Sequence, residues 1–167
     1  IGNGSALFDG ATDLIKVNAD SSINNLFEKG GTFTAWIKPD SVGETAGRIA
    51  EKGFLLYLTA VSGSTCKLTI GIPFSTTQGD WVTTNLDVNF DEWQHIAITY
   101  DGSSTSNEAI MYFNGISVSV YNSTSPVGTI SADTADLYIG NNSATTRSFD
   151  GEMSQFALWR GALTQAQ

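Results

Sequence analysis

The segment from Met111 to Ile116, Met-Tyr-Phe-Asn-Gly-Ile, constrains the fold of this chain more than any other. An Asn-Gly pair between two runs of alternating residues is typical of a two-residue β-hairpin, in which the turn fixes the residues that face each other. That register pairs Phe113 with Ile116, Met111 with Val118, and Ala109 with Val120. All three pairs are apolar, whereas a shift by one residue would bury serines. The sequence therefore predicts two antiparallel strands with one buried face.

The rest of the chain also favours strands over helices. Gly, Ser, Thr and Asn are frequent beside aromatic and β-branched residues, and windows rich in Leu, Lys and Glu are few. We expect strands at residues 5–9, 12–17, 31–38, 48–52, 54–60, 66–72, 81–88, 92–100, 108–114, 116–121, 135–140 and 152–159. An open twisted sheet rarely holds twelve strands, so they should divide between two packed sheets. The predicted fold class is all-β, an antiparallel two-sheet jelly-roll sandwich.

Length and composition limit the organisation and the partners of the chain. A chain of 167 residues without a linker or an internal repeat predicts a single domain, residues 1–167. It begins with Ile1 rather than Met, which favours a domain excised from a longer protein. The net charge of −9 disfavours nucleic acid as a partner. With no apolar run of about 18 residues, no membrane insertion is expected.

A single cysteine, Cys66, excludes an internal disulfide and a site built from several thiolates. Its setting in a strand favours a small buried residue over a reactive thiol. The only histidine, His95, alternates with apolar residues of a predicted strand, and this pattern favours a structural role over general-base catalysis.

Six phrases along the chain resemble one family of β-sandwiches. They are Ala6–Gly10 with Asp13–Val17, Phe33–Asp40, Trp93–Gly102, Met111–Gly115, Leu137–Gly140, and Phe149–Trp159 with Ala162–Thr164. In this order they resemble the laminin G-like and pentraxin-like branch of the concanavalin A-like lectin/glucanase superfamily. The resemblance implies a jelly roll that takes ligands on its concave face or its rim loops, often with a bound calcium ion.

Two Phe-Asp-Gly phrases suggest where a calcium ion would bind. Calcium prefers several oxygen ligands, and Asp-Gly turns place carboxylates beside unpaired carbonyl groups. The first and last strands of a jelly roll are usually neighbours, so Asp9 and Asp150 are expected to meet, with Asp13 near them. These three residues are the predicted metal ligands. The alternative is that each carboxylate only stabilises its own turn.

Glycan recognition usually needs an aromatic face and pairs of amides or carboxylates that bond sugar hydroxyls. Trp81 beside Asp80 offers the first, and Asn141, Asn142 and Arg147 offer the second, so these five residues are the predicted ligand-binding set. The alternatives are that Trp81 covers a sheet edge and that the 141–147 loop is merely solvated. Three other tryptophans, Trp36, Trp93 and Trp159, lie in strongly patterned strands and are assigned to core packing.

The sequence offers no catalytic residues that we can name. No Glu-x-Asp-x-Glu phrase occurs, and no Gly-x-Ser-x-Gly motif accompanies the single histidine. We therefore predict a non-catalytic, extracellular or surface-displayed module that binds a glycan or glycoconjugate, with a structural calcium ion. Two alternatives stay open. One is a structural or protein-interaction module, such as a virion decoration, tail-fibre or adhesin domain that binds other surface proteins. The other is a glycan hydrolase or lyase.

Overall fold

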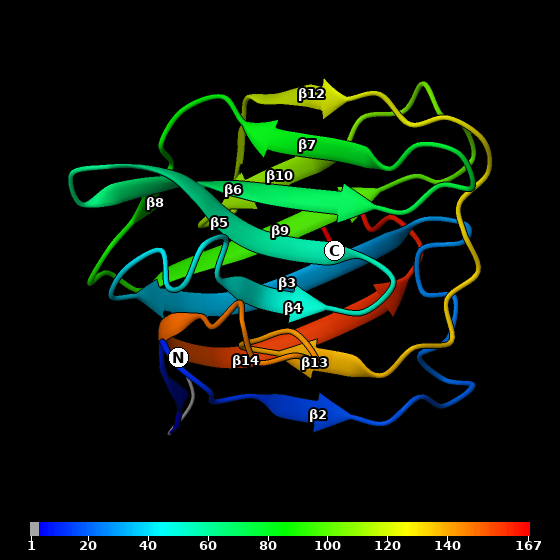
Figure 1. Cartoon of the computed structure of the whole chain (residues 1–167). Helices are drawn as coiled ribbons and strands as arrows, with labels where there is room; N and C mark the ends of the chain where they lie inside the picture. The colour runs from blue at the N-terminus through cyan, green and yellow to red at the C-terminus, as the bar shows by residue number, and fades with distance from the viewer. Residues whose placement is uncertain (1–3) are drawn as a thin grey trace.

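The computed structural model describes residues 4–167 as two antiparallel β-sheets packed face to face (Figure 1). The first sheet has six strands in the order β1-β14-β3-β9-β10-β11. Their bounds are β1 Ala6–Asp9, β14 Asp150–Arg160, β3 Gly31–Pro39, β9 Gln94–Tyr100, β10 Ile110–Phe113 and β11 Ile116–Val118. Strands β1 and β14 come from opposite ends of the chain, and β3 is the long central strand that joins them to the 94–113 region.

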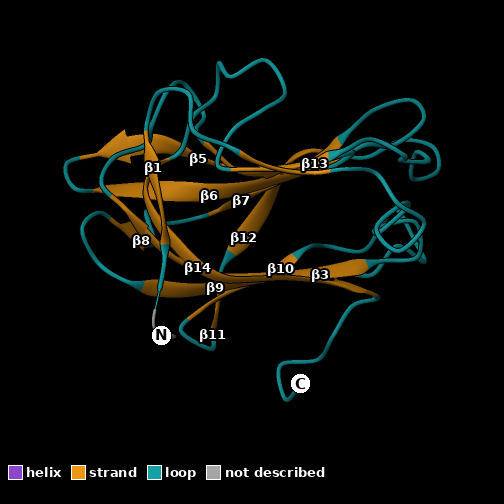
Figure 2. Cartoon of the chain, turned by 90° about the horizontal axis from the view of Figure 1, so that it is seen from below, coloured by secondary structure: helices purple, strands orange, loops and turns teal. Residues whose placement is uncertain are grey.

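The second sheet has eight strands and lies across the core from the first (Figure 2). Seven follow the order β12-β7-β6-β5-β4-β13-β2, and β8 pairs with β6. Their bounds are β12 Val120–Thr124, β7 Gly79–Thr83, β6 Thr65–Ile72, β5 Leu55–Ser62, β4 Arg48–Glu51, β13 Leu137–Ile139, β2 Ile15–Val17 and β8 Val88–Asn89. The architecture confirms the predicted all-β sandwich of two antiparallel sheets. No helix long and apolar enough to cross a membrane occurs in the described part of the chain.

The predicted hairpin is confirmed at its turn and at two of its three pairs. Asn114 and Gly115 have φ angles of 50° and 80°, as a turn of this type requires. Phe113 faces Ile116, and Met111 faces Val118. The third pair, Ala109 with Val120, is wrong.

The reason is that residues 116–121 do not form one strand. β11 ends at Val118, the chain crosses at Ser119, and β12 begins at Val120 in the other sheet, where Val120 pairs with Thr83. The Ser119 carbonyl accepts a hydrogen bond from the Thr84 amide at 2.8 Å, which fixes the crossing. The predicted strand at 81–88 is likewise two strands, β7 and β8.

Inward-facing side chains of both sheets form one core. Among them Phe33, Ile37, Leu56, Leu58, Leu68, Ile70, Ile96 and Ile98 have no exposed surface. Cys66 belongs to this core, and its burial raises the pKa of the thiol to about 12. The thiol therefore stays protonated, which agrees with the predicted structural role.

A bulge in β14 changes which of its residues face the core. Ser154 faces Trp36 and Ala157 faces Thr34, so two residues, Gln155 and Phe156, oppose only one residue of β3. Gln155 adopts a φ of 51°, as is common at a bulge. The extra residue reverses the alternation along the rest of the strand.

Because of this reversal, Leu158 packs against the core and Trp159 points outward with 40 % of its surface exposed. The assignment of Trp159 to core packing is therefore wrong. Trp36 and Trp93 are also only partly buried, and Trp36 lies on the outer side of β3 because Phe33, Ala35 and Ile37 face inward.

Candidate functional site

Trp81, expected on a rim, lies instead in the core. It has no exposed surface, its ring packs 4.9 Å from that of Tyr100, and its indole N–H donates to a carboxylate oxygen of Glu108 at 2.5 Å. β7 begins at Gly79, two residues earlier than expected, and Trp81 is on its inward side. A sugar ring has no access to this side chain. The prediction that Trp81 lies at the surface and binds a ligand is therefore wrong.

Asn141 is also fully buried, and its polar atoms are occupied by the protein. Its Nδ2 donates to Ser148 Oγ at 2.8 Å, and its Oδ1 accepts from the backbone amides of Asn142 at 2.9 Å and Arg147 at 3.1 Å. Asn141 therefore shapes the 141–147 loop and is not in position to contact a ligand directly. Asn142 and Arg147 are partly exposed on that loop.

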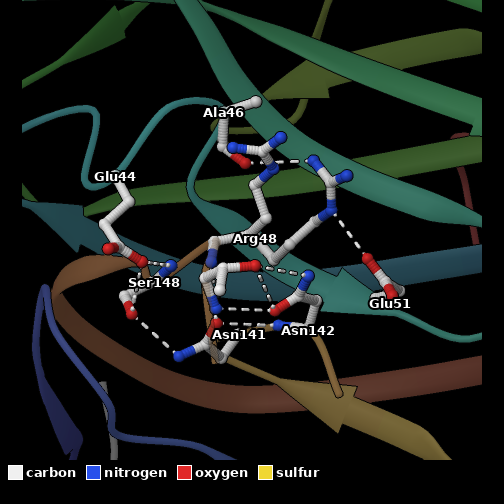
Figure 3. Close-up of polar contacts among 9 residues, drawn as sticks. Glu44, Ala46, Arg48, Glu51, Asn141, Asn142 and Ser148 are labelled. Atoms are coloured by element: carbon white, nitrogen blue, oxygen red, sulfur yellow. Dashed lines mark hydrogen bonds and ion pairs between the residues drawn. The ribbon is translucent and has the colours of Figure 1, made fainter. Parts of the chain in front are cut away.

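The 141–147 loop is joined to the loop before β4 (Figure 3). A carboxylate oxygen of Glu44 accepts from the amide of Ser148 at 3.1 Å and from its hydroxyl at 3.2 Å. The Arg48 amide donates to the Arg147 carbonyl at 2.8 Å. The Ser148 hydroxyl also contacts the Ala11 carbonyl. These bonds place Arg147 directly beside the first residue of β4.

Arg48 is held in a fixed position on the outer face of the eight-stranded sheet. Its guanidinium carbon lies 4.7 Å from the centre of the Tyr57 ring. Its Nε is 2.8 Å from a carboxylate oxygen of Glu51, and its Nη1 donates to the Ala46 carbonyl at 3.0 Å (Figure 3). Only 11 % of the Arg48 side chain is exposed. A planar cation with three defined partners loses little freedom when it binds a further group.

Asp80 lies on the same outer face, farther along the sheet. It is opposite Gly71 of β6, and a Cβ atom on Gly71 would lie 2.7 Å from Asp80 Oδ1 and 2.6 Å from Gln78 Nε2. Gln78 donates to Asp80 at 2.7 Å, so glycine at position 71 leaves room for this amide–carboxylate pair. The pKa of Tyr57 is raised by burial and then by the negative charge of Asp80.

Together these residues form an outer-face surface with an aromatic ring, an ion pair and an amide–carboxylate pair. We call it the Arg48–Asp80 surface, and its members are Arg48, Glu51, Tyr57, Gln78 and Asp80, with Asn142 and Arg147 at its rim. The predicted ligand-binding set contains Asp80, Asn142 and Arg147 of this surface but not Arg48, Glu51, Tyr57 or Gln78. The alternation of Tyr57 with the buried Leu56 and Leu58 gives its direction, but not its neighbours, because the sheet order was unknown.

The three predicted calcium ligands lie close together in the chain's fold. Asp9 and Asp150 are directly opposite in the β1–β14 pair, so the two Phe-Asp-Gly phrases meet as expected. Asp9 Oδ1 accepts from the amides of Ala11 at 2.9 Å and Thr12 at 3.2 Å, and the first of these bonds is the main cause of the lowered pKa of Asp9. Asp13 Oδ2 accepts from the Asp9 amide at 3.2 Å.

These carboxylates only partly fit a calcium site. Asp150 Oδ2 is also occupied, because it accepts from the Ser41 hydroxyl at 2.6 Å. Within residues 4–167, no three His, Cys, Asp or Glu side chains are grouped closely enough to hold a metal ion. The oxygen donors are of the type that calcium prefers, but a cation here would also need carbonyl or hydroxyl oxygens from the two turns.

The chain belongs to the concanavalin A-like lectin/glucanases superfamily, because the family model Laminin G 3 of that superfamily matches residues 9–167. This confirms the resemblance found in the sequence. No curated protein sequence matches the chain.

Solved structures with the same fold come from several organisms. The heptameric SAP-like pentraxin of Limulus polyphemus is 19 % identical with a TM-score of 0.63, over 92 % of this chain and 79 % of that one. Domain 4 of the Geobacillus stearothermophilus extracellular arabinanase AbnA, in complex with arabinotriose, is 18 % identical with a TM-score of 0.66, over 98 % and 73 %. The Ruminococcus gnavus IT-sialidase CBM40, bound to α2,3 sialyllactose, is 12 % identical with a TM-score of 0.64, over 93 % and 96 %. At these identities the similarity establishes the fold.

Proposed function

We propose that this domain is a non-catalytic glycan-binding module that uses the Arg48–Asp80 surface. The observation that carries the proposal is the fixed Arg48 guanidinium, held between the Tyr57 ring and the Glu51 carboxylate on an outer face. Sugar hydroxyls are bonded best by planar, paired groups of this kind, and the Tyr57 ring, one face of which Arg48 covers, adds apolar surface beside them. Two solved structures of the same fold are described as complexes with arabinotriose and sialyllactose, which supports the ligand class.

The spacing of the acidic residues on this surface favours binding over hydrolysis. Glu51 and Asp80 lie in the same row of the sheet, on β4 and β7, with β5 and β6 between them. Three strand spacings separate their backbones by about 14 Å. A glycosidase holds two carboxylates about 5 to 9.5 Å apart around one bond, whereas here the Glu51 carboxylate binds Arg48 and the Asp80 carboxylate binds Gln78. The proposed partner is a glycan or glycoconjugate, and the proposed setting of the domain itself is extracellular or surface-displayed.

A glycan array tests this proposal. We expect the domain to bind at least one array glycan. Tyr57→Ala should weaken that binding by about tenfold, because it removes both the aromatic face and the support of Arg48. Asp80→Asn removes the charge but keeps the shape, and it should weaken binding by a smaller factor. Ile116→Ala, an exposed change in the other sheet, is the control that should leave binding unchanged.

Uniform absence of binding on the array would contradict the proposal and favour the protein-interaction alternative. Glycan cleavage by the purified domain would contradict its non-catalytic part. Thermal melts of each variant separate a lost contact from a lost fold.

Calcium binding at Asp9, Asp13 and Asp150 stays a prediction. Asp9 and Asp150 are like charges placed directly opposite in an antiparallel pair, which is unfavourable unless a cation lies near them. We therefore expect calcium to raise the melting temperature and a chelator to lower it, with Asp150→Asn abolishing the difference. Equal melting temperatures with calcium and with chelator would show that these carboxylates serve only their turns.

A further inference from the structure

A groove of ≈ 340 Å³ crosses the outer face of the six-stranded sheet. Its floor consists of small side chains on the two central strands, Thr32 and Thr34 of β3 and Ala97 and Thr99 of β9. The volume falls in the range of about 300 to 1,000 Å³ that is usual for small-molecule sites. The sheet that carries it is the one opposite the Arg48–Asp80 surface.

Aromatic side chains on the flanking strands form the walls of the groove. Trp159 of β14 is opposite Thr32, and Tyr112 of β10 is opposite Ala97, so the two rings stand on either side of the floor. His95 lines the same groove and packs edge-on against Trp36, with 5.4 Å between ring centres. The bulge in β14 is what turns Trp159 toward this side.

The segment after β14 completes the groove and lies on the outer side of the six-stranded sheet (Figure 2). The Leu163 amide donates to Thr32 Oγ1 at 2.9 Å, and the Thr32 hydroxyl donates to the Gly161 carbonyl at 2.9 Å. Farther along, Gln165 Nε2 donates to the Gly115 carbonyl at 2.8 Å. These bonds span the sheet from β3 to the β10–β11 turn and hold glutamine side chains at the groove.

The chemistry of the lining is polar but uncharged. Among the residues that the structure describes, no Asp, Glu, Lys or Arg side chain lines the groove, although the chain as a whole has a net charge of −9. The Thr34 hydroxyl, Gln165 Oε1 and Gln167 Nε2 supply donors and acceptors at the groove, whereas the Thr32 hydroxyl, Gln165 Nε2 and Gln167 Oε1 are bonded within the protein. Burial lowers the pKa of His95, so its imidazole is neutral at pH 7. These side chains provide no counter-charge for phosphates or carboxylates.

We propose that this groove is a second ligand site, which binds one neutral sugar ring with its apolar face against Trp159. The ring hydroxyls would bond the Thr34 hydroxyl of the floor and the remaining amide atoms of the C-terminal segment, Gln165 Oε1 and Gln167 Nε2. The choice of a sugar as ligand rests on the proposed function, whereas the site itself is separate from the Arg48–Asp80 surface. The domain would then contact glycans from both of its sheets.

The experiment is a titration of the ¹⁵N-labelled 167-residue domain with glucose, galactose, mannose, xylose and arabinose, each followed by amide and indole resonances. N-acetylneuraminic acid serves as the charged comparison. We expect at least one neutral sugar to shift the Trp159 indole and the Thr34 and Ala97 amides in a saturable way, and the acid to leave them unchanged. Trp159→Ala should weaken that binding by about tenfold. Ala97→Leu, which fills the floor without entering the core, should abolish it.

The resonances separate this proposal from the preceding one. Shifts confined to the Arg48–Asp80 surface would overturn the groove and support the proposed function, and shifts confined to the groove would do the reverse. The groove would also be ruled out as the site if the sugar shifted the amide resonances of groove residues equally in the unmodified domain, in Trp159→Ala and in Ala97→Leu. Unaffected amides elsewhere in each variant spectrum show that the variant is folded.

Discussion

Lys52→Met is expected to destabilise the domain by about 3 to 5 kcal/mol, the usual cost of removing one partner of a buried ion pair. The Lys52 side chain has no exposed surface, and its Nζ lies 3.0 Å from Asp133 Oδ2 and 2.7 Å from the Ala135 carbonyl. The substitution leaves the Asp133 carboxylate, which is 11 % exposed, without a cation. Urea unfolding at pH 7 measures the loss.

The effect should be large because this pair joins two distant parts of the chain. Lys52 is in the turn between β4 and β5, and Asp133 is in the loop between β12 and β13. Backbone and side-chain bonds between Asn25 and Asp133, at 2.8 and 2.7 Å, fix the same loop. Removing both charges in a Lys52→Met/Asp133→Asn double variant should recover part of the loss, since no unpaired charge is then buried.

Lys16→Met is the matched control. Lys16 pairs with Asp136 at 2.8 Å, but the two side chains are 46 % and 28 % exposed. An exposed pair of this kind contributes little to stability, because water screens the two charges. Equal losses for Lys52→Met and Lys16→Met would contradict the view that burial decides the contribution.

Trp81→Ala is expected to cost about 3 to 5 kcal/mol as well, because it leaves a large cavity between the sheets. Trp81 is fully buried, packs on Tyr100, and bonds Glu108 through its indole N–H. Urea unfolding followed by far-ultraviolet circular dichroism measures the loss without relying on the removed fluorophore. Trp81→Phe should cost less, because it keeps much of the apolar volume.

Trp159→Ala makes the same chemical change at an exposed position and should cost only about 1 kcal/mol. If Trp159→Ala destabilised the domain as much as Trp81→Ala, the placement of Trp81 in the core and Trp159 outside it would be wrong. The comparison thus tests the two tryptophans whose roles the structure exchanges relative to the sequence prediction.

The two tryptophans whose locations were predicted wrongly show which features of the fold the sequence pattern predicts and which it does not. Period-two alternation located the strands and the register next to the Asn114-Gly115 turn, because both depend on nearby residues. The prediction failed for Trp159 because the one-residue bulge at Gln155 reverses the alternation after Ser154. The amino-acid sequence does not indicate a bulge reliably. The face of the sheet on which the residues after the bulge lie could therefore not be predicted.

The candidate site could not be predicted fully because the order of the strands in each sheet was unknown, although most strands were predicted. Residues 116–121 alternate without interruption across the crossing at Ser119, since Val118 and Val120 both pack toward the core from different sheets. The Arg48–Asp80 surface likewise depends on β4, β5, β6 and β7 being neighbours, which the turn lengths alone did not determine. Asp9 opposite Asp150 was predictable, because the general topology of a jelly roll places its first and last strands together.

The crossing at Ser119 also bears on self-association. The edge strands are β1 and β11 in the first sheet and β2 and β12 in the second. β1 is followed directly in the chain by β2, and β11 by β12. These edge strands have only 4, 3, 3 and 5 residues. Long edge strands with unpaired backbone groups pair with strands of other chains and lead to aggregation. Short edge strands that continue into the opposite sheet offer few backbone groups for such pairing. Copies of the domain at high concentration would therefore have little tendency to merge into extended sheets.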